Sequence, residues 1–459
     1  MSTICRERAP RPPRLAVVFL VAWSTAAGAE APPTTLIYPP WGHCYGLHRV
    51  TQMHLTMRAG FRAKFDDPQG VAAVKMRAED DTTTAKDDDE LTVFGVNSGQ
   101  DQIIYNTSLT AIAFYGTSGR GPGQFRRPTG IAADRSGLVV VADTGNDRLH
   151  VLWYADDRLE HRRFIQGDFA GARLVRPRGV ALEAGEIYVC DPENHRILVL
   201  DPEGNLRRLL APTQDGRPVL REPTAVAAIR ARADFNFFGE DFVAVVDSGH
   251  TRLLQLSHDG RVLALCRSNE LGPQARRFDW VAIDYHANVY CSDRSGRLHK
   301  FDRKLHPLLS IGRPGKHDYE FDEPRGLGLY RRFGQLFVAE RAGAQYLWTG
   351  TDVFTPQLAD LAGGADSTWT GEVRFFLTEY ARVQLELVDA SENRVVLLQT
   401  PRWQNVGPVT MPVRFRLAPP SEPLRLRVEA TPTYSSRSYL TVRKLGPPLS
   451  FPRVVGASP

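Results

Sequence analysis

The sequence has few of the residues that mark common metal, redox and nucleotide sites. Its 459 residues include 5 cysteines, and no two of them have the C-x-x-C spacing of a zinc or redox site. There is no glycine-rich phosphate loop and no G-x-S-x-G nucleophile elbow. These absences leave no motif for phosphate-loop chemistry, for a serine nucleophile or for a paired-cysteine site.

Long apolar runs are also absent, with one exception at the N-terminus. A basic head with four arginines precedes the apolar run 15–23, and small residues follow at 27–29. This is the layout of a secretory signal peptide cleaved before Glu30, and the run is too short to span a bilayer. We therefore expect removal of residues 1–29 and export to the periplasm, the cell surface or the medium. The alternative is an uncleaved signal anchor, which would then be the membrane contact of the chain.

Excess positive charge is scarce once that segment is set aside. The whole chain has a formal net charge of +5, and residues 1–29 carry +3 from four arginines and one glutamate, which leaves +2. Proteins that bind nucleic acid through its phosphates depend on a basic surface. Binding to nucleic acid is therefore disfavoured.

Four cysteines remain after residue 29, at Cys44, Cys190, Cys266 and Cys291. An even number permits two disulfides in an exported protein. Cys190 and Cys291 lie within apolar runs that predict strands, so we expect small buried side chains there. Cys266 with Cys291 is the first pair to consider for a bond.

Self-similar segments fill the middle of the chain, and the two clearest copies are 125–154 and 174–201. Each has a large apolar residue, a Pro-x-Gly step, an apolar strand, a second strand ending in Asp, a tight turn, an Arg and a third strand. Weaker copies bring the starts to six, at Phe65, Phe125, Leu174, Leu220, Phe278 and Phe321. Their spacing of 43 to 60 residues suits one four-stranded blade each.

These segments resemble NHL repeats, and the resemblance covers residues 60–350. It implies an all-β fold, a six-bladed β-propeller whose innermost strands begin at the Pro-x-Gly step beside the central axis. A closed ring leaves no exposed sheet edge, and residues 30–59 are expected to hold the strand that closes it.

Residues 367–446 follow a different pattern. Apolar and polar residues alternate on short strands, which predicts a small β-sandwich. Through Arg374-Phe375-Phe376-Leu377 and residues 383–389 it resembles the immunoglobulin-like module of the flagellar hook-cap type. That resemblance implies attachment or assembly rather than chemistry. Residues 351–366 are expected to be a linker and 447–459 a tail.

Polar residues at equivalent turns of the repeats are expected to lie together on one rim. The candidate binding residues are Asp143, Asn146, Arg148, Asp191, Asn194, His195, Arg196, Asp247, His250, Arg252 and Asp293. The first interpretation is that they close hairpins and pair between blades. The second is that they form a polar ring that a ligand meets. No catalytic residue is expected.

One NHL propeller enzyme, peptidylglycine amidating lyase, has zinc histidines directly after the repeat proline. Here those positions hold Gln69, Thr129, Arg178, Thr224 and Arg325, so the resemblance does not extend to that zinc site. No metal ligand is assigned and no cofactor is predicted, although a divalent ion in the propeller channel stays an alternative.

These observations predict an exported, non-catalytic binding or scaffold protein. Its rim or channel mouth would contact a protein or glycan partner, because equivalent turn residues of a repeat array share one face. The alternative is a metal-dependent propeller enzyme of the lactonase or lyase kind.

Overall fold

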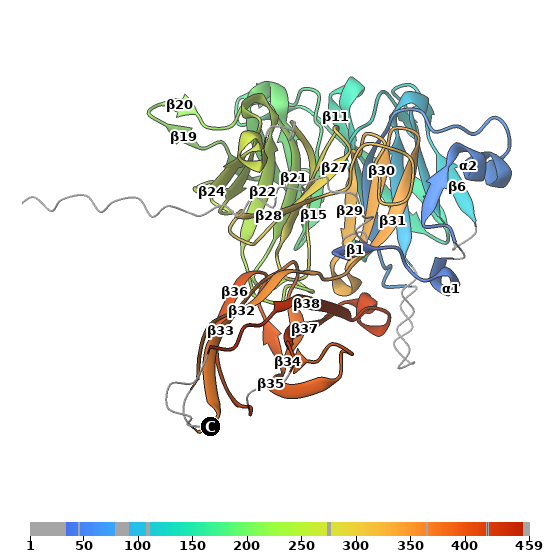
Figure 1. Cartoon of the computed structure of the whole chain (residues 1–459). Coiled ribbons are helices and arrows are strands. Elements are labelled where there is room, and N and C mark those ends of the chain that lie inside the picture. The colour runs from blue at the N-terminus through green and yellow to red at the C-terminus, as the bar shows by residue number, and fades with distance from the viewer. Residues whose placement is uncertain are drawn as a thin grey trace, which may run out of the picture. The chain divides into compact units, whose positions relative to one another are not determined.

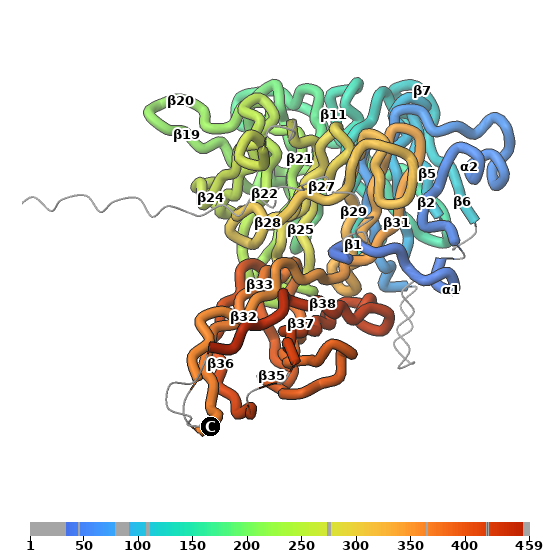
Figure 2. Tube along the Cα trace, in the orientation of Figure 1, coloured from blue at the N-terminus to red at the C-terminus, as the bar shows by residue number. Residues whose placement is uncertain are grey.

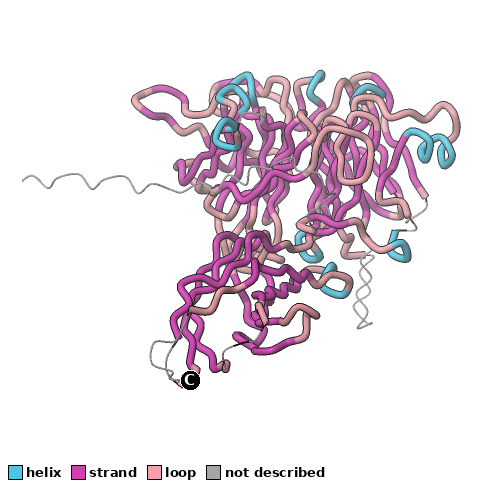
Figure 3. Tube along the Cα trace, viewed as in Figure 1, coloured by secondary structure: helices cyan, strands magenta, loops and turns pink. Residues whose placement is uncertain are grey.

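The computed structural model describes residues 34–44, 46–78, 91–106, 111–272, 277–363, 366–418, 420 and 422–452. The expected signal segment 1–29 lies outside these residues. Nearly all regular structure in the described chain is β-strand (Figures 1 and 3). Two short helices, α1 (Trp41–Cys44) and α2 (Gln52–Ala59), precede the first sheet. Within the described ranges, no helix has the length and hydropathy needed to cross a membrane.

Six antiparallel sheets, numbered here as blades one to six, follow one another along the chain. Blade one has β3 (Pro68–Val74), β4 (Thr92–Asn97), β5 (Gln102–Asn106) and β6 (Ile112–Tyr115). Blade two has β9 (Ile131–Ala133), β10 (Leu138–Asp143), β11 (Arg148–Ala155) and β12 (Arg158–Ile165). Blade three has β15 (Val180–Glu183), β16 (Glu186–Asp191), β17 (Arg196–Leu200) and β18 (Leu206–Leu210).

The remaining blades have the same order. Blade four has β21 (Pro223–Ile229), β22 (Phe242–Asp247), β23 (Arg252–Leu256) and β24 (Val262–Arg267). Blade five has β25 (Phe278–Ile283), β26 (Val289–Asp293), β27 (Arg297–Phe301) and β28 (Pro307–Ile311). Blade six has β29 (Leu327–Tyr330), β30 (Gln335–Glu340) and β31 (Gly343–Thr349). Two-stranded pairs between blades are β7 (Thr117–Ser118) with β8 (Gln124–Phe125), β13 (Asp168–Phe169) with β14 (Ala172–Arg173), and β19 (Thr213–Gln214) with β20 (Arg217–Pro218).

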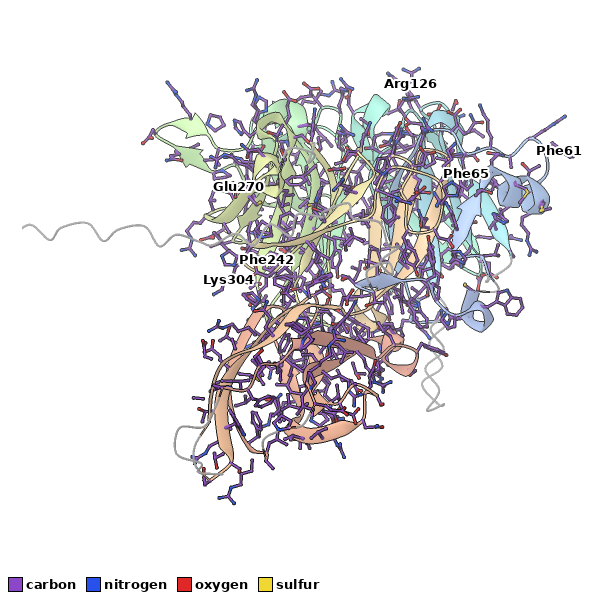
Figure 4. All side chains as sticks on the ribbon, viewed as in Figure 1. Phe61, Phe65, Arg126, Phe242, Glu270 and Lys304 are labelled. Carbon is purple, nitrogen blue, oxygen red and sulfur yellow. The ribbon has the colours of Figure 1, made fainter. Side chains whose placement is uncertain are left out.

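The innermost strands β3, β9, β15, β21, β25 and β29 form a closed ring. Each contacts the innermost strand of the next blade, and β29 contacts β3. The protein therefore contains a six-bladed β-propeller, through which the chain runs blade by blade (Figure 2). We call the face with the turns after the second strands the upper face. Figure 4 places Arg126 on it and Lys304 on the opposite, lower face.

The repeat residues explain this packing. The large apolar residues that start the copies at Phe125, Leu174, Leu220 and Phe321 are at most 2% exposed. Gly130 shows why the inner strand needs glycine, because a Cβ there would lie 2.1 Å from the carbonyl oxygen of Arg178 in the next blade.

Blade five differs from the predicted register. Phe278 pairs with Asp293 as Pro223 pairs with Asp247 in blade four. Phe278 therefore occupies the place of the repeat proline and is not the equivalent of Phe125. The likeness was misleading because both positions take a large buried side chain, and Phe278 is only 1% exposed.

The N-terminal segment completes blade six. Both β1 (Leu36–Ile37) and β2 (Arg49–Thr51) pair antiparallel with β31. This is the role expected for the segment before the first repeat. The ring is thus closed by strands from the two ends of the propeller sequence.

A β-sandwich with its own apolar core follows the propeller. One sheet has β32 (Val353–Gly363), β33 (Thr368–Leu377) and β36 (Gly407–Arg416). The other has β35 (Arg394–Gln404), β34 (Ala381–Val388), β37 (Arg425–Pro432) and β38 (Val442–Pro448). The expected linker 351–366 is therefore wrong in its larger part, because β32 pairs with β33. This strand contains Pro356, which is tolerated because β32 is an edge strand.

A buried polar cluster joins the sandwich to blade five. Glu379, between β33 and β34, is ion-paired with Lys300 of β27, and both side chains are 0% exposed. Glu379 also accepts a hydrogen bond from Asn288 Nδ2 at 3.1 Å and lies 3.2 Å from Nδ1 of His286. The same histidine atom lies 3.1 Å from the hydroxyl of Tyr434. Buried polar contacts thus connect the two domains.

The four described cysteines are free thiols and all are buried. The candidate bond between Cys266 and Cys291 is therefore not formed in this structure. Cys266 and Cys291 belong to one apolar cluster, and Cys190 and Cys291 are fully buried, as expected of them. Burial raises the pKa of Cys266 to about 12.

Candidate functional site

The turns expected on one rim share an arrangement that is clearest in blade three. Asp191 ends β16 and pairs with Arg196, which begins β17. Arg196 Nε donates to Asp191 Oδ2 at 2.7 Å, and its two Nη atoms donate to the carbonyls of Phe169 and Ala172 at 2.7 and 2.8 Å. Because Asp191 is 0% exposed, the guanidinium ties the hairpin to the incoming loop from inside the protein.

Blades two and four repeat this geometry. Arg148 Nε donates to Asp143 Oδ2 at 2.7 Å, and Arg252 Nε donates to Asp247 Oδ2 at 2.8 Å. Both aspartates are 0% exposed. Hairpin closure therefore accounts for the orientation of these four side chains.

The other predicted turn residues are more accessible. Nδ2 of Asn146 and of Asn194 donates to the aspartate of its own turn at about 2.9 Å. His195 is half-buried with a left-handed φ of +54°, and its Nδ1 accepts a hydrogen bond from the backbone of Glu222 at 3.2 Å. His250 is exposed, with its Nδ1 2.9 Å from an aspartate oxygen of its turn. A ligand-binding role for these residues stays a prediction.

Blades five and six fill the aspartate–arginine position differently. In blade five, Oδ2 of Asp293 lies 2.8 Å from Nε2 of His299. In blade six, Glu340 ends β30, and the residue five positions later is Gln345 instead of arginine. Arg49 of β2 supplies the guanidinium, with Nη2 3.2 Å from Glu340 Oε2. The N-terminal segment thus completes a turn that blade six cannot complete alone.

A second set of equivalent residues surrounds the upper mouth of the channel. Each directly follows the repeat proline at the start of an innermost strand, or Phe278 in its place in blade five, and we call them the channel-mouth ring. The ring consists of Gln69, Thr129, Arg178, Thr224, Asp279 and Arg325. The backbones meet directly here, since Gly70 N donates to the carbonyl of Thr129 at 2.9 Å. The ring is therefore a polar set of residues at the upper start of the inner strands.

The uncharged members of the ring are held by neighbours. The hydroxyls of Thr129 and Thr224 lie 2.8 and 2.5 Å from a hydroxyl of an upper-face turn. Gln69 Nε2 donates to Asp67 Oδ1 at 2.9 Å. These side chains are fixed in place before any ligand arrives.

Two of the three charged members are ion-paired and the third is not. Arg325 pairs with Asp67, and Asp279 accepts from Arg294 Nε at 3.0 Å. The side chain of Arg178 makes no hydrogen bond and no ion pair with any residue that the structure describes. Arg178 is therefore the available cation of the ring.

Charged groups of blade five influence the guanidinium of Arg178. Burial lowers the pKa of Arg178, which Asp279 opposes and which Arg294 and Arg277 reinforce. These three groups belong to blade five or precede it directly, whereas Arg178 begins blade three. Arg178 is half-buried, and an arginine keeps its positive charge in such a setting.

The ring does not suit a divalent cation. Its charged members are two guanidiniums and one carboxylate, and that carboxylate, Asp279, is already paired. Elsewhere in the described chain, no three His, Cys, Asp or Glu side chains gather in a way that could hold a metal ion. With two guanidiniums and one paired carboxylate, the channel-mouth ring is better suited to bind an anion than a cation.

Trp280 separates the channel mouth from a wider cavity below it. It stands where the other blades have glycine or alanine, and it is 6% exposed. A Cβ added to Gly70 in blade one would lie 3.1 Å from the indole of Trp280. The indole therefore extends from blade five to blade one. The cavity below has a volume of about 540 Å³ and touches every innermost strand.

Sequence reasoning named the residues after the repeat prolines but did not select them. At these positions the sequence showed only that the histidines of a zinc site are missing. It did not indicate a ligand for Arg178. A charged residue at the crowded start of an inner strand was the available signal. Asp279 was hidden because blade five has no proline to mark the position.

Comparisons with known proteins agree with this architecture. An NHL-repeat family model matches residues 125–152 and 174–200, which lie in blades two and three. No curated protein sequence matches the chain.

Several solved structures are similar in part. A structure provisionally assigned as a gluconolactonase has a TM-score of 0.44 and 14% identity, covering 62% of this chain and 90% of that one. A chain of the nidogen–laminin complex has a TM-score of 0.37 and 20% identity, covering 48% and 74%. Glutaminyl cyclase of Myxococcus xanthus has a TM-score of 0.33 and 12% identity, covering 50% and 87%. The chain carries NHL repeats within a β-propeller.

Proposed function

We propose that this protein is an exported, non-catalytic binding protein that recognises an anionic group of a protein or glycan partner at the channel mouth. The observation that carries the proposal is the guanidinium of Arg178, which has no partner among the residues that the structure describes, in a ring whose other members are engaged. An anion there would form charge-assisted hydrogen bonds in a partly desolvated setting, where such bonds are strongest.

The upper face supports a binding role more than a catalytic one. Its buried aspartates are held by arginines, so they are poorly placed as general bases. A lactonase or lyase with a channel metal would need oxygen or imidazole ligands where this ring has Arg178 and Arg325. Fixed neighbours and one available cation suit recognition of a carboxylate or a similar group.

The sandwich fits an accessory role in this proposal. We infer that it is the immunoglobulin-like module expected from the sequence and that it serves attachment or assembly. The buried contacts of Glu379 with Lys300 and Asn288 support rigid mounting, since both residues belong to blade five.

The test uses two immobilised polyanions, poly-L-glutamate for an acidic protein segment and polygalacturonate for an acidic glycan. Binding of the wild type is compared with Arg178→Gln and with Arg414→Gln. Arg414 is exposed on β36 of the sandwich, so both variants lose one positive charge. We expect Arg178→Gln to weaken binding by about tenfold, the loss of one charge-assisted hydrogen bond. Equal binding by the two variants, or no binding of either polymer by the wild type, would contradict the proposal.

A further inference from the structure

The channel contains a cavity below Trp280. This cavity is separate from the channel-mouth ring above it. Its volume of about 540 Å³ lies within the usual size range of small-molecule sites. Trp280 forms its upper limit and lines it, and no residue of the channel-mouth ring does so. A ligand in this cavity would therefore not touch the mouth.

Small apolar side chains form its wall. Ala72, Ala133, Ala181 and Ala227 line it and are only partly buried, although each lies on an innermost strand. The six inner strands thus leave an open apolar surface at the axis instead of closing on one another. Apolar surface that remains accessible in a concave site favours a ligand with an apolar body.

One arginine crosses the lower end of the cavity. Arg331 of blade six donates from Nη1 to Glu183 Oε2 of blade three at 2.9 Å. Its Nη2 donates to the carbonyl of Ala228 in blade four at 2.5 Å. Because blades three and six are opposite each other in the ring, this side chain spans the opening and narrows it.

An insertion of blade four, the crossing loop (residues 230–241), covers part of the same opening. Its Phe235 lines the cavity and lies beneath two guanidiniums, 5.9 Å from Arg135 of blade two and 5.6 Å from Arg332 of blade six. The loop is held from within, since Asn236 Nδ2 donates to the carbonyl of Arg230 at 2.8 Å. The loop therefore reaches over the axis from blade four toward two other blades.

The charges at this opening leave an excess of guanidinium groups. The three lining carboxylates are satisfied: Glu183 by Arg331, Asp234 by Arg135, and Asp134 by hydrogen bonds from its own turn. Arg77 and Arg232 also line the cavity and are exposed. Neither side chain has a hydrogen-bond or ion-pair partner within the described ranges. Both guanidiniums are therefore available to a negatively charged group at the opening.

We propose that this lower-channel cavity binds a small organic anion with an apolar body, its tail against the alanine wall and its charged end at Arg77 and Arg232. The inference is independent of the partner proposed for the upper mouth. Apolar burial supplies affinity, and the two arginines select the charge.

The first experiment measures cavity occupancy with 8-anilinonaphthalene-1-sulfonate, a compact aromatic sulfonate whose fluorescence rises in apolar sites. Ala227→Phe fills the cavity, and Ala133→Leu is a smaller filling variant should the first fold poorly. Ala362→Phe, at an exposed position of β32, adds the same ring outside the cavity. We expect saturable binding by the wild type and by Ala362→Phe, and at least about tenfold weaker binding by the filling variants.

The second experiment measures charge selection by displacing the dye with decanoate or with the uncharged decanol. Arg77→Gln/Arg232→Gln should weaken decanoate by about three- to tenfold and leave decanol unchanged, because only the carboxylate meets the arginines. Arg178→Gln should bind the dye as the wild type does.

Three results would overturn the inference. The first is an absence of saturable dye binding, and the second is equal binding by Ala227→Phe, Ala133→Leu and Ala362→Phe. The third is equal displacement by decanoate and decanol that the double arginine variant does not alter.

Discussion

Replacing Glu379 should destabilise the protein more than any loss of a surface ion pair. The side chain is 0% exposed, accepts from Lys300 Nζ and Asn288 Nδ2, and accepts from the backbone of Tyr380 at 2.8 Å. Burial alone would raise the pKa of Glu379, but Lys300 and His286 lower it to about 2. The carboxylate is therefore charged in the folded protein at neutral pH.

The magnitude follows from what Glu379→Gln leaves behind. Lys300 would stay 0% exposed, with the carbonyl of Thr378 at 2.7 Å, the ring of Tyr290 at 5.2 Å and the buried Asp284, whose pKa Lys300 lowers, as remaining neighbours. Removing one member of a buried ion pair costs about 3 to 5 kcal/mol because the other charge stays uncompensated. We expect the free energy of unfolding to fall by about that amount. The double variant Glu379→Gln/Lys300→Met should recover part of it, since no charge is then buried alone.

The assay is urea unfolding followed by tryptophan fluorescence and circular dichroism. The control is Glu429→Gln, which breaks a solvated pair with Arg443 at 2.7 Å whose side chains are 26% and 61% exposed. That change should cost less than about 1 kcal/mol. A cost of Glu379→Gln no larger than that of Glu429→Gln would contradict a buried ion pair of this strength, as would a full additional cost when Lys300→Met is added to the single variant.

Three further predictions concern the ion pair of Arg49 with Glu340, the carboxyl group of Asp284 and the buried thiols. Arg49→Ala should lower the free energy of unfolding by about 2 kcal/mol because it leaves Glu340, 3% exposed, without its guanidinium; thermal unfolding measures this, and an effect as small as that of Arg414→Ala would refute it. Burial, together with Glu379, raises the pKa of Asp284 to about 6. A raised carboxyl pKa favours folding at low pH, so stability should fall as pH rises from about 4 through 6, and Asp284→Asn should remove this slope from a pH series of urea midpoints. The four described cysteines should not react with Ellman's reagent until the protein unfolds; rapid reaction of the folded protein would contradict their burial.

Local sequence signals account for the blades that match the repeat well. The Asp and Arg of blades two and three stand five residues apart and meet across one hairpin, so a short-range pattern contains both partners. Pairs between distant segments leave no such pattern. Arg49 and Glu340 lie 291 residues apart, and Glu379 meets Lys300 over 79 residues. The edge strand β32 was missed although it pairs with β33, and pairing on one side only is what tolerates Pro356 within it.

The channel shows the same division between what is local and what is not. The Pro-x-Gly step predicted where inner strands begin, and the positions of Arg178 and Arg325 followed from it. That Trp280 crosses to blade one and Arg331 to blade three depends on the curvature of the ring, which no single repeat encodes. Sequence reasoning therefore located the channel but not the residues that divide it.

The pairing of β1 with β31 has a consequence for the order in which the protein is made. Leu36 pairs with Thr349, which is synthesised more than three hundred residues later. The ring therefore cannot close until the last blade has been made. Contacts of this sequence separation form late and slowly, because the entropy of a long loop is lost before any contact rewards it. Until β1 and β2 pair with β31, blade six has an unpaired strand edge. Such an edge can pair with strands of other chains. The N-terminal strands thus pair late in folding. The new chain is most prone to misassembly just before they pair with β31.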